Sequence, residues 1–69
     1  MPRSYNVQAD PGQALQPRWL YYWVGDYPVW THDVDKAKML SAYDAALAVG
    51  KARAAGFPLA KRVVIKEQP

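Results

Sequence analysis

One aromatic segment limits what this chain can fold into. Six large rings fall within twelve residues, and they are Trp19, Tyr21, Tyr22, Trp23, Tyr27 and Trp30. Aromatic and β-branched residues favour strands, and the dipeptide Gly25-Asp26 interrupts the run as a tight hairpin turn would. The segment therefore predicts a β-hairpin with strands over 18–24 and 27–31. Pro28 removes one backbone donor, which favours an edge position for the second strand.

The next part of the sequence predicts one main helix. Ser41 and Asp44 form a variant of the capping box, and good helix formers fill residues 42–54. Gly56 is suited to the left-handed position that ends a helix, and Pro58 prevents continuation. Apolar spacing of three and four residues predicts a buried stripe. Its members are Tyr43, Ala46, Leu47, Gly50 and Ala54.

The remaining segments complete a small sheet. Residues 60–66 predict a final strand, which a helical crossover returns beside the hairpin. Residues 1–17 alternate apolar and polar side chains but also contain prolines, so they leave open a mobile arm or a short edge strand. The predicted fold class is α+β, a two-layer domain of an antiparallel hairpin, one main helix and a C-terminal strand in a three- to four-stranded sheet. The domain is expected to span 18–66, with a tail over 67–69.

Composition excludes several classes of protein. Sixty-nine residues make one small domain, and the absence of cysteine excludes a disulfide or cysteine–zinc scaffold. No stretch approaches the ~20 apolar residues of a membrane span, and the N-terminus lacks the apolar run of a secretory signal. We expect a cytoplasmic protein without a membrane segment, whose core rests on packing alone.

Residues for catalysis are sparse. His32 is the single histidine, and with Asp33 and Asp35 it suggests, as a third hypothesis, a metal-assisted hydrolase. A catalytic metal needs about three ligands held in fixed geometry, whereas Asp33 or Thr31 is better suited to cap a short helical turn over 34–37. We therefore predict that the chain is not an enzyme and uses no cofactor or metal.

The aromatic strand suggests a binding surface. Regular alternation would place Trp19, Tyr21 and Trp23 on one face of the sheet, and Leu20, Tyr22 and Val24 on the other. One helix can cover only one face, so large rings should remain on the open face, where they mark a partner surface. The predicted anchors are Trp19, Tyr21, Trp23 and Trp30, with Arg18 as a rim charge. Three alternatives remain: the N-terminal arm covers this face, the tyrosines simply lie flat there, or the chain forms a homodimer.

A second feature is the distribution of charge. The formal net charge is +3, and residues 45–66 contain five basic side chains and no acidic one. Lys51 and Arg53 could merely complement the helix C-terminus, and the other cations could blunt an edge strand. The functional alternative is a module for single-stranded nucleic acid, in which bases stack on the aromatic face. Its phosphate contacts would be Lys61, Arg62 and Lys66.

A short pattern in the middle of the chain resembles small bacteriophage and prophage proteins. It comprises Tyr27-Pro-Val-Trp30-Thr31-His-Asp33, Lys36-Ala37-Lys38, Leu40-Ser41 and Asp44-Ala45. In those proteins an aromatic-Trp-Thr turn precedes a Lys-Ala turn and a Ser-capped, alanine-rich helix. The resemblance carries over no catalytic residue. It implies a small phage accessory protein that binds and inhibits a host protein or complex in the host cytoplasm.

Overall fold

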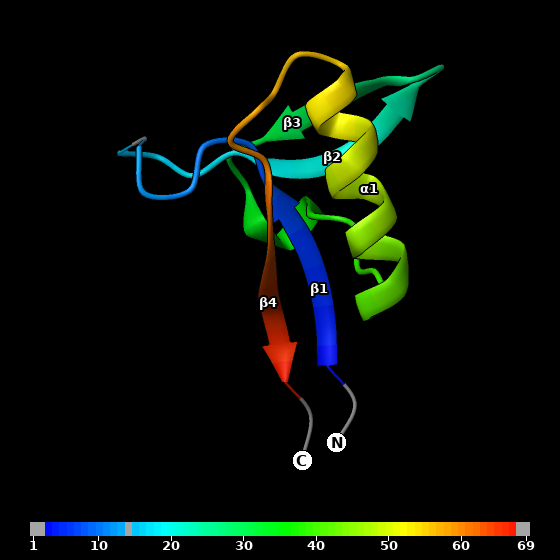
Figure 1. The fold of residues 1–69 in the computed structure, drawn as a ribbon. Coiled ribbons are helices and arrows are strands. Elements are labelled where there is room, and N and C mark those ends of the chain that lie inside the picture. Colours follow the sequence, from blue (N-terminus) through cyan, green and yellow to red (C-terminus); the bar gives the residue numbers. More distant parts are fainter. Residues whose placement is uncertain (1–2, 14, 68–69) are drawn as a thin grey trace.

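The computed structural model describes residues 3–13 and 15–67. Its elements are β1 (Arg3–Gln8), β2 (Trp19–Val24), β3 (Tyr27–Thr31), the 3₁₀ turn η1 (Val34–Lys36), α1 (Ala42–Ala54) and β4 (Lys61–Glu67). The four strands form one antiparallel sheet in the order β3-β2-β1-β4, and α1 packs against one face of it (Figure 1). This arrangement confirms the predicted α+β class.

The N-terminal segment lies inside the sheet. Residues Arg3–Gln8 form β1, which is paired along its whole length with β4 and, at Gln8, with Trp19 of β2. The prediction of a strand here is confirmed. Its predicted edge position is wrong, because β4, which follows α1, pairs with β1 and not with the hairpin. The edge position predicted for β3 is confirmed. Glu67 belongs to β4, and the rest of the predicted tail lies outside the described residues.

A β-bulge in β2 changes which side chains face the helix. Leu20 pairs with Trp30 and Tyr22 pairs with Val29, so Tyr21 has no partner on β3. An extra residue shifts the alternation of the strand. Leu20 is fully buried, and Trp23 packs against the same core. The predicted regular alternation is therefore wrong beyond the bulge, since Trp23 lies on the helix side.

The helix packs through its smallest side chains. Ala45, Ala48 and Ala52 are buried, and the last two pack with Val7 and Leu20 in the core. The predicted stripe of Tyr43, Ala46, Leu47, Gly50 and Ala54 is wrong, because all five are exposed. The physical reason is the bulk of the sheet. Indole rings at Trp23 and Trp30 already fill the space beneath the helix, and alanine allows α1 to approach.

The predicted helix ends are confirmed. The Ser41 hydroxyl accepts a hydrogen bond from the Asp44 N–H at 3.0 Å, as an N-cap does. Gly56 adopts a φ of 109°, and the Phe57 N–H donates to the Ala52 carbonyl, which is the bond of a Schellman motif. Asp33 caps η1 in the same way, with its side chain accepting from the N–H of Asp35.

Asn6 occupies the point where β2 separates from β1. Its side chain is fully buried. The amide nitrogen donates to the carbonyls of Leu20 and Lys38, and the amide oxygen accepts from the Leu20 N–H at 2.8 Å. Beside it, Leu40 exchanges two backbone bonds of 2.8 Å with Tyr5. The Asn6 amide thus replaces strand pairing and holds β1, β2 and segment 38–40 together.

We predict that Asn6→Ala lowers the free energy of unfolding by about 3 kcal/mol, because the Leu20 N–H and the Lys38 carbonyl lose their partner, while the Leu20 carbonyl keeps its bond from the Lys38 N–H. Urea unfolding followed by tryptophan fluorescence measures the change. Gln8→Ala is the matched control, since it removes an amide that is only partly buried in the same strand. Equal effects of the two substitutions would contradict the role assigned to Asn6.

Asn6→Asp tests the two hydrogen bonds that the amide nitrogen of Asn6 donates. A carboxylate here could accept from the Leu20 N–H but would face two carbonyl oxygens without a proton to donate. Burial and these acceptors raise the pKa of the introduced carboxyl in the folded state. The variant should therefore be most stable below the carboxyl's unfolded pKa and lose stability as pH rises through the raised value. Unfolding free energies that do not fall with pH relative to the parent would contradict this prediction.

Candidate partner-binding surface

Two neighbouring tyrosines dominate the sheet face that α1 leaves open. Tyr21 and Tyr22 are 43% and 46% exposed, and their rings meet edge to face with centroids 5.0 Å apart. Trp19 precedes Leu20 and Val24 follows Trp23, and both Leu20 and Trp23 face the helix. Because neighbouring side chains of a strand point to opposite faces, Trp19 and Val24 lie on the open face. Trp19 is half-buried and Val24 is exposed. We call Trp19, Tyr21, Tyr22 and Val24 the open-face patch.

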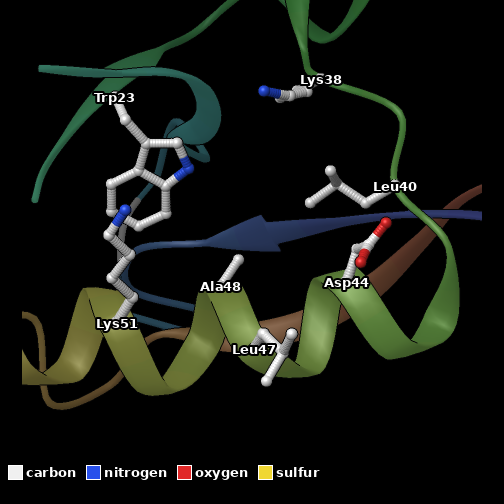
Figure 2. A pocket seen from close by; sticks show the side chains of 7 residues that line it. All are labelled: Trp23, Lys38, Leu40, Asp44, Leu47, Ala48 and Lys51. Carbon is white, nitrogen blue, oxygen red and sulfur yellow. The ribbon is translucent and has the colours of Figure 1, made fainter. Parts of the chain in front are cut away.

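Trp23 belongs to the opposite side of the sheet. Its indole lies beside α1, with the Lys51 Nζ 4.4 Å from the ring centroid (Figure 2). Lys51 also lies 3.5 Å from an Asp26 carboxylate oxygen in the hairpin turn, so it links the helix to the hairpin. Together these groups wall a pocket of about 310 Å³. It is lined by Trp23, Lys38, Leu40, Asp44, Leu47, Ala48 and Lys51.

The prediction that Trp30 and Arg18 belong to the open-face surface is also wrong. Trp30 packs against Phe57, with ring centroids 5.1 Å apart, and its indole nitrogen is buried without a hydrogen-bond partner among the described residues. The Arg18 guanidinium lies 5.8 Å from the centroid of the same Phe57 ring, and it forms an ion pair with Asp10. The structure therefore brings Trp19 and Tyr21 together, and separates Trp23, Trp30 and Arg18 from them.

The basic residues line a different groove. Arg62 of β4 faces Arg53 of α1 across a groove of about 330 Å³, whose other lining residues are Ala46, Val49 and Lys61. The Arg62 guanidinium stacks 4.9 Å from the Tyr5 ring centroid on the helix side. Lys66 is exposed farther along β4. Arg62 pairs with Val7 and therefore lies on the helix side, whereas Lys61 pairs with Gln8, which in turn pairs with Trp19, so Lys61 shares the face of the open-face patch at its Trp19 end.

The residues of the metal hypothesis make local contacts. The His32 Nδ1 lies 3.1 Å from the Pro17 carbonyl, and Asp33 accepts from the backbone of Asp35 at 2.9 Å. Across residues 3–13 and 15–67, no three histidine, cysteine or acidic side chains gather as metal ligands would. Sequence reasoning missed Asn6, whose partners lie 14 and 32 residues away, and Asp10, whose partner Arg18 lies across a loop of proline and glycine. No local signal could have identified them.

Comparisons with protein-family models, with curated proteins and with solved structures find no significant match for this chain. None of the described helices has the length and apolar character that crossing a membrane requires.

The division between core and patch makes a stability prediction. Trp30→Ala should lower the free energy of unfolding by about 3 kcal/mol, because it removes a large ring from the core. Tyr22→Ala should cost less than about 1 kcal/mol, since its ring is half exposed. Urea denaturation of the two variants and the parent measures both values. A cost for Tyr22→Ala equal to that for Trp30→Ala would place the tyrosine in the core and remove the open-face patch.

Proposed function

We propose that this chain is a small non-enzymatic interaction domain that binds a partner protein through its open-face patch. One observation carries the proposal. The bulge at Tyr21 brings two tyrosine rings side by side on the face without a helix, and both remain more than 40% exposed. Val24, at 61% exposure, extends the apolar surface. Contiguous apolar patches of this kind are uncommon on domains that have no partner.

The chemistry of the patch supports a protein as the occupant. Tyrosine combines a large ring with a hydroxyl group that can donate or accept, and it loses little side-chain entropy on binding. Pairing of Leu20 and Tyr22 with β3 fixes the backbone on both sides of Tyr21, so little further ordering opposes association. Following the resemblance to small phage proteins, we propose that the partner is a host protein and that the chain is phage-encoded and inhibits it.

A single-stranded nucleic acid is the alternative occupant of the same face. That function requires cations beside the rings, so that phosphates are bound while bases stack. Of the predicted phosphate contacts, Lys61 lies beside Trp19, but Arg62 lies on the helix side and Lys66 pairs with Ser4, farther along β1. A partner protein requires no row of cations beside the rings, and this dispersal of the cations therefore favours it.

Affinity capture from a bacterial lysate tests the proposal. The parent, the double variant Tyr21→Ala/Tyr22→Ala and the control Tyr43→Ala are compared, each with and without nuclease. Tyr43 is 72% exposed on α1, so the control removes an exposed ring away from the patch. We expect one or more proteins to be retained by the parent and by Tyr43→Ala, to be lost with the double variant, and to be unaffected by nuclease.

Other results would contradict the proposal. Retention that disappears after nuclease treatment would support nucleic acid on this face. Capture that survives the double variant would exclude the open-face patch as the contact. Sedimentation of the purified parent as a dimer that the double variant converts to a monomer would show that the patch binds a second copy of the chain.

A further inference from the structure

A second binding site lies at the other edge of the molecule. We infer that the outer edge of β4, with the groove beside α1, binds an extended acidic segment of a protein as an added strand. This inference goes beyond the proposed function, because it concerns different residues on a different side of the sheet. It rests on three observations: an unpaired strand edge, a groove next to that edge, and a basic lining.

The first observation is the edge itself. β4 is the last strand of the sheet, and within residues 3–13 and 15–67 no strand pairs with its outer side (Figure 1). It runs for seven residues without proline, and a bulge at Ile65 leaves residues 61–64 as its regular stretch. By contrast β3, at the opposite edge, has five residues and is interrupted by Pro28. An unpaired edge presents backbone donors and acceptors to which an extended peptide can add, and β4 is the edge suited to this.

The second observation is the shape beside the edge. Ala46, Val49 and Arg53 are spaced so that they share one side of α1, and that side faces β4. The groove between them has a volume of about 330 Å³. Side chains of a strand alternate between the two faces of a sheet. Every second side chain of an added strand would therefore point toward α1 and into this groove, while the backbone pairs with β4.

The third observation is the charge of the groove. Arg53 donates from Nε to the Ala60 carbonyl at 3.1 Å, and Arg62 donates from Nη1 to the Ala42 carbonyl at 3.3 Å. These bonds orient both guanidinium groups and leave further N–H donors on each. Among the described residues, no carboxylate forms an ion pair with Arg53, Lys61 or Arg62. Carboxylates are the groups that pair with such forks, so the site selects acidic side chains.

A peptide fits these features better than a nucleic acid does. None of the five lining residues carries an aromatic ring on which a base could stack. Ala46 and Val49 instead give the groove an apolar floor, and the unpaired backbone of β4 matches another peptide backbone. The occupant we propose alternates acidic and β-branched residues.

A titration followed by amide chemical shifts tests the site. The probe is a peptide of about eight residues that alternates valine and glutamate, added up to about 5 mM so that weak binding is detected. We expect shifts at amides of residues 61–66 and at Arg53. Lys61→Glu should weaken binding by about fivefold or more, because it replaces an attraction with a repulsion. Lys36→Glu, which makes the same charge change on η1, should alter it by less than about twofold.

Three further measurements distinguish strand addition from other kinds of binding at this site. The same peptide methylated on alternate backbone nitrogens should not bind, because it cannot complete the strand pairing. Binding that survives methylation, or no shift at residues 61–66 at any concentration, would overturn the inference. Tighter binding of oligothymidine than of the peptide at these amides would overturn it in favour of nucleic acid. Tyr21→Ala/Tyr22→Ala should leave peptide binding intact, so the two proposals can fail separately.

Discussion

The fold depends on a single buried amide. A strand that leaves its neighbour in the middle of a sheet exposes backbone groups that must find other partners. At Leu20 the side chain of Asn6 accepts from the N–H and donates to the carbonyl, which also accepts from the Lys38 N–H at 2.9 Å. A peptide-like group is needed here, because a hydroxyl or a carboxylate cannot reproduce both bonds together with the third bond to Lys38. This amide allows β2 to diverge from β1 without leaving backbone groups unpaired.

The divergence explains where the surfaces lie. β1 pairs with β4 along its length but with β2 only at Gln8 and Trp19, so the sheet consists of two ribbons that separate on one side (Figure 1). A helix of thirteen residues packs on one face and leaves the other face without a helix. The rings on the open face, and the grooves on either side of α1, follow from covering a divided sheet with one short helix.

Local signals in the sequence predicted the elements that local interactions determine. The hairpin turn at Gly25, the Ser41 cap and the Gly56 end of α1 each depend on residues within a few positions of one another, and all three are confirmed. The interior position of β1, the bulge at Tyr21 and the alanine face of α1 depend on contacts between distant segments. Periodicity could not reveal them, because an inserted bulge residue reverses the faces of a strand. The bulge moves Trp23 to the helix side, and Trp30 lies there because it pairs with Leu20, so only Trp19 and Tyr21 of the predicted anchors lie on the open face.

The separation of rings and cations has a consequence for how the domain would bind. In the sequence the aromatic and basic segments could form one composite surface, as in a nucleic-acid platform. In the fold, the open-face patch points away from α1, while the guanidinium groups of Arg53 and Arg62 lie at the groove beside α1. Burial of rings is nearly independent of salt, whereas attraction between exposed charges is screened within about 8 Å at physiological ionic strength. The two surfaces would therefore contribute to the free energy of binding in different ways, one insensitive to salt and one sensitive to it. A partner that used both would have to wrap around the β4 edge.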